Sequence, residues 1–315
     1  MLIQNVRAER EPLLLFLGLL LAYNVNLRVL HTGDCFAAPH VTLSLLSSGN
    51  FELNEYSWED VDPAHYGVVE VGGRKLSKYP VMSSVLAAPI FFVALGFSDA
   101  HKAPLIYYVA KFCATVFVSL SVVFLYLAVR RVRSEWALTT ALVYGLGTCA
   151  WTVSQALWQH PGSMMFLALA LYLLVRGEEE VRFVPPAGGA LAMAVACRYF
   201  DIVSALFLSV FVLHRHRGQF LRFAAWGAPV GVFLAAYHEF YFGSLFGTGY
   251  GHEAASGWSN PMLAGFLGLM ISPGVGLLFY SPVLLFAFVG MARTLVQPAA
   301  AGLLLRYLTV AFFVS

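Results

Sequence analysis

Charged residues are what this sequence has least of. They make up only 11% of its 315 residues, whereas 59% of the residues are hydrophobic and the mean hydropathy is +0.74. Because a soluble domain carries about 25% charged residues, this composition argues against a water-soluble protein. The net charge is +2, and the basic residues are not clustered as nucleic-acid binding requires. We therefore expect an integral membrane protein that does not bind nucleic acid.

Cysteines, internal repeats and low-complexity segments are also scarce. The four cysteines, Cys35, Cys113, Cys149 and Cys197, show neither a disulfide framework nor the spacing of a metal site. Only Cys35 lies in a polar segment, and the others lie in apolar runs, where cysteine usually packs as a small hydrophobe. The lack of repeats argues against the paired repeats on which many transporters are built.

Apolar runs are abundant, and many approach the roughly 20 residues that a membrane-spanning helix needs. Two stretches are ambiguous: 80–97 is short, and 186–213 is interrupted between Arg198 and Asp201. The other predicted spans lie near 12–30, 104–129, 135–153, 161–176, 219–242, 277–296 and 299–315.

The positions of the arginines predict a topology, because basic loops face the cytoplasm. All arginine clusters share that side if 80–97 does not cross fully and 186–213 crosses twice as a pair of short helices. The N-terminus is then cytoplasmic. The outward-facing segments are 31–103, 154–160, 198–201 and 243–276, and we expect them to frame one cavity.

These features predict the fold class: an all-α, polytopic transmembrane helical bundle, with residues 1–315 forming a single domain. Its first outer loop, 31–79, is long and polar and is expected to carry juxtamembrane helices. One of these, over 37–46, has apolar residues on one side and is predicted to lie in the membrane interface.

Asp34 is the most informative residue, because it lies where the first apolar run ends. An ionised carboxylate at the edge of a bilayer costs free energy unless it has a partner or a function there. Two interpretations remain open: Asp34 caps a helix that begins near Cys35, or it is a general base that faces the cavity. In the second case the loop 31–79 carries the active site.

Lys78 and Arg198 are the candidate cations of the same cavity. Lys78 precedes Tyr79 and a short apolar run, so it either extends its ammonium group to the interface or binds a phosphate. Arg198 and Asp201 are expensive in an apolar stretch. They either pair with each other one helical turn apart, or Arg198 binds a phosphate at the cavity wall.

His160, beside Gln159, begins a predicted span on the outer side. It is either a hydrogen-bonded boundary histidine or part of the site. The acidic residues of the first outer loop are typical of a solvated face. Asp60 and Asp62 are an alternative ligand pair for a divalent cation, but two carboxylates define no metal site, and we expect no certain cofactor.

The order of these residues resembles the GT-C superfamily of membrane glycosyltransferases, which includes protein O-mannosyltransferases and the lipid A aminoarabinose transferase. In that family an Asp at the head of the first outer loop precedes a short helix and a Ser-Gly pair, here Asp34 and Ser48-Gly49. A group of bacterial members is more similar. The motifs shared with that group are Gly33-Asp34, Leu157-Trp158-Gln159-His160, Phe242-Gly243 with Gly249-Tyr250, Ser272-Pro273 and Tyr280-Ser281-Pro282.

Two departures from the family matter. Better-known members often have a second acidic residue directly after the loop Asp, where this chain has Cys35. If a second carboxylate is needed, Glu52 or Glu55 must supply it. The family's C-terminal spans and soluble domain do not follow, so we expect the chain to be truncated relative to the family.

The resemblance implies transfer of a sugar from a polyprenyl phosphate to an acceptor hydroxyl on the outer side of a bacterial inner membrane, with inversion. Asp34 would take the acceptor proton, while Lys78 and Arg198 would stabilise the leaving phosphate. The acceptor, whether protein, glycan or lipid, stays open, and the implied partners are the lipid-linked donor and membrane lipids. The alternatives are a lipid or solute transporter (flippase) and a noncatalytic scaffold. The further candidates for substrate binding are Tyr79, Gln159, His160 and Glu55.

Overall fold

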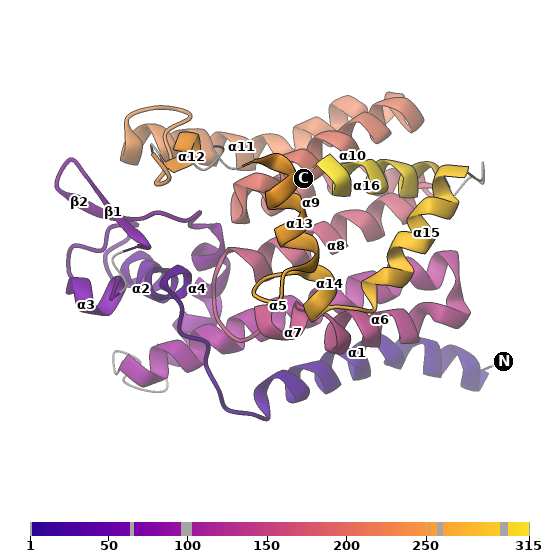
Figure 1. Ribbon diagram of the computed structural model, residues 1–315, viewed down its shortest axis with the longest axis horizontal. Helices are drawn as coiled ribbons and strands as arrows, with labels where there is room; N and C mark the ends of the chain where they lie inside the picture. Colours follow the sequence, from indigo (N-terminus) through magenta and orange to yellow (C-terminus); the bar gives the residue numbers. More distant parts are fainter. Residues whose placement is uncertain are drawn as a thin grey trace.

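The protein is predominantly helical, with one two-stranded sheet among the described residues (Figure 1). The computed structural model describes residues 2–63, 66–95, 103–251, 253–256, 261–296 and 302–314. The coarse prediction of a helical fold is therefore confirmed.

Long helices run in alternating directions along the long axis of the molecule (Figure 1). Helix α5 packs against α1 and α8, α8 packs against α9, and α9 packs against α11. The N-terminus and the arginine-rich turns lie together at one end, which we call the N-terminal end, and the opposite end is the loop end. The helices are α1 Leu2–Asn24, α5 Ala103–Val132, α6 Ala137–Gly147, α8 Gln159–Gly177, α9 Val184–Cys197, α10 Ile202–Arg215 and α11 Phe220–Phe242.

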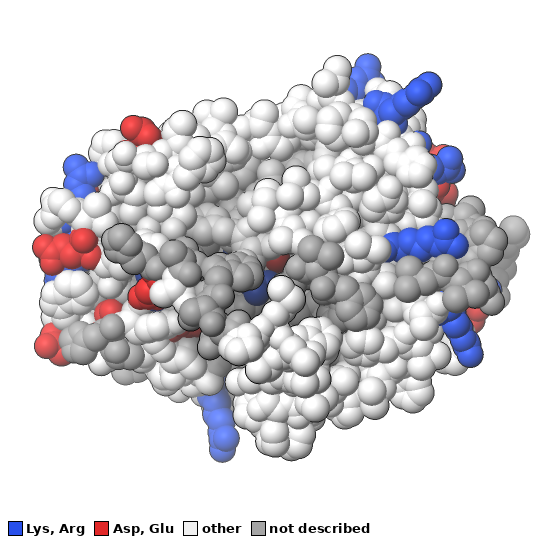
Figure 2. Space-filling model, turned by 45° about the horizontal axis from the view of Figure 1, so that its top comes forward, with Lys and Arg blue, Asp and Glu red and all other residues white. Residues whose placement is uncertain are grey.

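Two of these helical segments, Leu105–Val132 and Arg217–Phe242, are long and apolar enough to cross a membrane, judged by length and composition among the described residues. On the face in Figure 2, most charged side chains lie at the two ends of the long axis, and few lie between them. Such a band suits a hydrocarbon environment, where charges are expensive.

The two ambiguous stretches fold as expected at the level of secondary structure. In the described part of the chain, helix α4, Met82–Leu95, has 14 residues, or about 21 Å, which is less than the thickness of a bilayer core. The stretch 186–213 forms α9 and α10, which are separated by a short 3-10 turn, Tyr199–Asp201.

Several predicted spans are interrupted. The run 277–296 divides into α14, Leu277–Tyr280, and α15, Leu284–Val296. The break falls at Ser281 and Pro282, where proline lacks the backbone N–H that a continuing helix needs. The prediction of one helix there is wrong.

Two more boundaries differ from expectation. The run 135–153 divides into α6 and α7, Ala150–Val153, and the span predicted over 12–30 ends in α1 at Asn24. Helix α16, Gly302–Val314, lies within the predicted span 299–315. Part of 243–276, expected to be an outer loop, forms the apolar helix α13, Met262–Ile271, which lies beside the middle of the bundle in Figure 1. The assignment of α13 to the loop end is therefore wrong.

A compact head at the loop end is built from the segment after α1. It contains α2, Gly33–Ser47, α3, Trp58–Val61, and the antiparallel hairpin of β1, Val68–Val71, and β2, Arg74–Ser77. The hairpin departs from the all-α prediction. The core of this head contains Leu53, Val61, Leu76 and Val81, together with Tyr237 and Tyr241 of α11.

Helix α2 is an internal element. Its residues 39–44 are all buried, and it packs against α4. The expectation of an amphipathic helix lying in the membrane interface over 37–46 is therefore wrong. Because α2 is enclosed, the start of this helix is held firmly where Asp34 lies.

Candidate functional site

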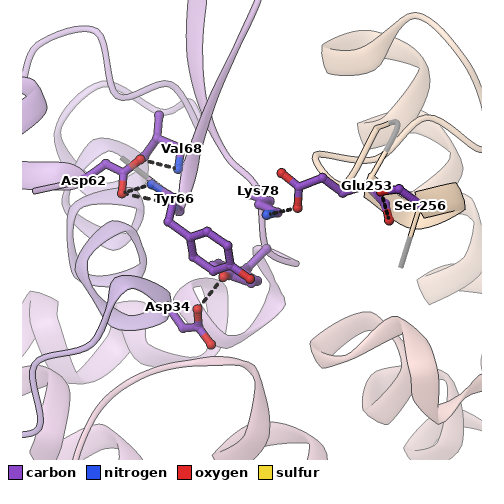
Figure 3. Close-up of polar contacts among 9 residues, drawn as sticks. Asp34, Asp62, Tyr66, Val68, Lys78, Glu253 and Ser256 are labelled. Atoms are coloured by element: carbon purple, nitrogen blue, oxygen red, sulfur yellow. Dashed lines mark hydrogen bonds and ion pairs between the residues drawn. The ribbon is translucent and has the colours of Figure 1, made fainter. Parts of the chain in front are cut away.

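Asp34 lies in the first turn of α2 but is not its cap. The N-cap is Thr32, whose side chain makes no capping hydrogen bond. The Asp34 carboxylate instead accepts a hydrogen bond from the Tyr79 hydroxyl (Figure 3). The capping interpretation is thus wrong, although a negative charge in the first turn still interacts favourably with the helix dipole.

Asp62 holds the loop that approaches Asp34 from the other side. The residue is 1% exposed. One carboxylate oxygen accepts from the backbone N–H groups of Tyr66 (2.8 Å) and Gly67 (2.9 Å), and the other accepts from Val68 (3.1 Å). Both oxygens are therefore occupied by the backbone. Asp62 is a structural residue, and the cation-ligand interpretation of the Asp60–Asp62 pair is wrong.

The turn that Asp62 holds packs directly on the start of α2. A Cβ atom added to Gly67 would lie 2.7 Å from the carbonyl oxygen of Gly33. The carbonyl of Gly67 accepts a hydrogen bond from the Lys78 backbone N–H (2.9 Å). These contacts fix Tyr66 and Lys78 relative to Asp34.

Lys78 is enclosed rather than extended to solvent. The residue is 3% exposed. Its ammonium nitrogen lies 4.0 Å from the ring centroid of Tyr66 and 5.9 Å from that of Tyr250, so aromatic faces stabilise the cation. It also forms an ion pair with Glu253 of α12, Glu253–Ser256 (Figure 3). The interpretation of Lys78 as a cation reaching the interface is wrong.

Gly249 and Tyr250 bring the segment after α11 onto Lys78. A Cβ atom on Gly249 would lie 2.4 Å from the Lys78 Cα and 2.6 Å from its carbonyl oxygen. Only glycine permits this crossing, which places the Tyr250 ring 6.0 Å from that of Tyr79. The spacing of the Phe242-to-Tyr250 motif is thereby explained.

Arg198 and His160 come from other helices: Arg198 follows the end of α9, and His160 lies in the first turn of α8. The Arg198 guanidinium lies 3.4 Å from the carboxylate of Asp201, which also accepts a hydrogen bond from Ser163. Burial raises the pKa of Asp201, whereas the hydrogen bond from Ser163 and the charge of Arg198 lower it. The Arg198–Asp201 pairing is thus confirmed, but the Arg198 side chain is still 38% exposed and available to a ligand.

The charges of both Asp34 and Arg198 act on His160. Its pKa is lowered to about 4, first by burial and then by the charge of Arg198, while the charge of Asp34 raises it. His160 is therefore neutral at pH 7. Its Nδ1 atom, like the Oε1 atom of Gln159, is buried without a hydrogen-bond partner among the described residues. Such atoms are favourable contacts for a ligand.

Tyr250 interacts with both groups of residues, since its ring lies near that of Tyr79 and its hydroxyl forms a hydrogen bond with Gln159. Burial raises its pKa, hydrogen bonding with Gln159 lowers it, and the charges of Asp34 and Arg198 act on it in opposite directions. The pKa of Tyr79 is also raised, mainly by burial and by its hydrogen bond to Asp34, so both phenols stay protonated at pH 7. The site thus combines the Asp34 carboxylate, two cations that are each paired with a further carboxylate, a neutral histidine and phenol groups.

Glu55 does not join this cluster. It accepts hydrogen bonds from Ser44 (3.0 Å) and Ser48 (3.3 Å) at the far end of α2, about 15–20 Å along the helix from Asp34. Glu52 pairs with Arg74 at 3.4 Å. The expectation that Glu52 or Glu55 supplies a second carboxylate near Asp34 is therefore wrong.

Glu253 is the carboxylate that sequence reasoning missed, together with Tyr66. Its only signal is its position directly after the Phe242-to-Tyr250 motif. No cluster of three metal-ligating side chains occurs in the part of the chain that the structure describes. The Asp34 carboxylate suits proton transfer, and the cations Lys78 and Arg198 suit anion binding.

No protein-family model matches this chain, and the comparisons with curated proteins and with solved structures likewise found no match.

Proposed function

We propose that this protein is a polytopic membrane glycosyltransferase of the GT-C type, which moves a sugar from a polyprenyl phosphate to an acceptor hydroxyl. The observation that carries the proposal is the convergence of Asp34, Lys78 and Arg198 at the loop end. They come from three separate parts of the chain, and Lys78 is buried whereas Asp34 and Arg198 are partly exposed, so a ligand can reach the carboxylate and the guanidinium.

The bilayer setting is part of the proposal. The alternating helices, the small number of charges in the middle of the face in Figure 2 and the collection of arginine-rich turns at the N-terminal end support a cytoplasmic N-terminus and an outward site. The short helices α4, α9 and α10 would bring polar residues to the membrane edge. We place the protein in a bacterial inner membrane because of its resemblance to bacterial family members.

The cationic side of the site suits the donor. The Glu253 carboxylate, whose side chain is 64% exposed, binds the buried ammonium group of Lys78. An oxyanion therefore already occupies the position in which a lipid phosphate would bind. Arg198 offers a second, partly exposed cation, so the two could share the charge of the leaving phosphate.

The reaction follows from these positions. The acceptor oxygen forms a bond to the anomeric carbon while the bond from that carbon to the phosphate oxygen breaks. The bonding electron pair leaves with the phosphate, whose charge Lys78 and Arg198 stabilise. The acceptor proton passes to Asp34, acting as general base. Attack from the face opposite the phosphate inverts the anomeric centre.

The test is transfer of labelled sugar from a polyprenyl phosphate by the purified protein in liposomes. Asp34→Asn should lower turnover by about 10²–10⁴-fold without changing the unfolding temperature by more than a few degrees. The matched control is Glu70→Gln, which removes an exposed carboxylate from β1. Near-normal turnover of Asp34→Asn would refute the assignment. Movement of intact donor across the bilayer without transfer would favour the transporter.

A further inference from the structure

A cavity lies at the N-terminal end, at the opposite end of the bundle from Asp34. Its volume is about 440 Å³, within the range of small-molecule sites. It is enclosed by α5, α8, α10 and α16, and its wall is mainly apolar. The apolar lining consists of Ala128, Val129, Val132, Leu171, Val175, Phe211, Leu304 and Leu305.

Charged residues of both signs gather at one side of this cavity. Glu178 is held by Arg215 at 3.0 Å and by His216 at 2.9 Å. Arg131 pairs with Glu179, whose side chain is 50% exposed. An exposed ion pair contributes little free energy, so a stronger anion can recruit Arg131.

Arg133 is the cation left over. Its guanidinium has no ion pair or hydrogen bond among the described residues, and it lines the cavity beside Arg131. With both acids already paired, the cavity has a surplus of positive charge at its rim. The rim therefore suits an anion.

The apolar wall extends away from these arginines into the bundle. On α5 the lining passes from Arg131 to Ala128, and on α8 it passes from Val175 to Leu171, one helical turn in each case. A ligand that fits both parts has an anionic group joined to an apolar chain. Inorganic phosphate would leave the apolar wall uncovered.

Exposed tryptophans indicate the depth of the arginines. Trp136, three residues after Arg133, is 60% exposed, and Trp226 on α11 at the same end is 58% exposed. Tryptophan is enriched at the level of lipid headgroups. A phosphate at that level would meet Arg131 and Arg133, and its acyl chain would point toward the helices.

We propose that this cavity binds an anionic glycerophospholipid, with the phosphate on Arg131 and Arg133 and one acyl chain along Leu171 and Val175. Basic pockets between membrane helices on the cytoplasmic side suit such headgroups. The inference shares with the proposed function only the bilayer setting, and it uses none of the residues around Asp34.

The test is thermal unfolding of the purified full chain in mild detergent with added short-chain lipids. Phosphatidylglycerol at ten times its Kd should raise the midpoint by about 2–5 °C. Phosphatidylcholine and inorganic phosphate should each raise it by less than half as much. An equal shift with phosphatidylcholine would overturn the charge assignment, and an equal shift with phosphate alone would overturn the lipid.

Variants tie the effect to the cavity. Arg133→Gln should at least halve the lipid-induced shift, while Arg217→Gln, in another exposed turn of the same end, should leave it unchanged. Leu305→Trp, at a position 42% exposed, fills the cavity, and Leu221→Trp, 82% exposed and outside the lining, is its control. An undiminished shift in both cavity variants would refute the proposal. Asp34→Asn should keep the full shift, so loss of transfer and loss of lipid binding are distinguishable.

Discussion

The ion pair between Lys78 and Glu253 yields a prediction with opposite signs for stability and binding. The Lys78 side chain is 2% exposed and that of Glu253 is 64% exposed. Exposed pairs contribute about 0–1 kcal/mol, whereas breaking a buried pair costs about 3–5 kcal/mol. For this half-exposed pair we expect Glu253→Gln to lower the free energy of unfolding by about 1–2 kcal/mol.

The same substitution should strengthen donor binding. In the unliganded protein the Glu253 carboxylate competes with the lipid phosphate for Lys78. If about 1–2 kcal/mol of competition is removed, the Kd for a polyprenyl phosphate should fall by about 5–30-fold. Lys78→Gln should instead raise that Kd, because it removes the cation itself.

The assay is equilibrium binding of a fluorescent polyprenyl phosphate to protein in nanodiscs, combined with thermal unfolding of the same samples. Glu59→Gln, an exposed carboxylate of α3, is the control for a general loss of negative charge. Weaker binding by Glu253→Gln would show that Glu253 helps to hold the donor rather than competing with it, and the reasoning would fail.

Three further outcomes are expected. Gly249→Ala places a methyl group 2.4 Å from the Lys78 Cα, so it should weaken polyprenyl phosphate binding at least tenfold. Gly265→Ala, with open space around it, should not weaken binding. Equal binding by both variants would refute the close approach. Asp62→Asn should lower the free energy of unfolding by about 2–4 kcal/mol, because one buried oxygen acceptor is replaced by a donor facing backbone N–H groups, and the loss should not depend on added Mg²⁺. The pKa of His160 is about 4 in the folded protein against an ordinary value of 6.5. Between pH 4 and pH 6.5 the imidazole therefore binds more protons in the unfolded chain than in the folded one. Up to roughly 3 kcal/mol of the free energy of unfolding is therefore present above pH 6.5 and is lost as the pH falls toward 4. A pH–stability profile of His160→Asn that keeps the wild-type slope would contradict this.

Local pattern predicted much of the helical framework. Apolar runs marked the positions of α1, α5, α8 and α11, because a helix in an apolar surrounding must satisfy its own backbone hydrogen bonds. The arginines indicated which helix ends lie together. The break at Ser281–Pro282 has a local cause, the proline, that the prediction of a single span did not use. The burial of α2 was not predicted because it depends on what packs against that helix.

The candidate site was predicted only in part. Asp34, Lys78, Tyr79, Gln159, His160 and Arg198 were identified as single unusual residues, and the structure brings them together. Glu55 was chosen because it is close to Asp34 in sequence, but the length of α2 separates them. Glu253 was missed because 175 positions separate it from its partner, Lys78.

The sequence by itself determined most of the helical segments, because apolar composition and prolines act locally along the chain. Only the tertiary structure decided which side chains meet. The crossing of Gly249 over Lys78 and the three backbone amides on Asp62 arise from contacts between separate segments. Such contacts depend on the packing of the whole head against α11, which no local pattern specifies.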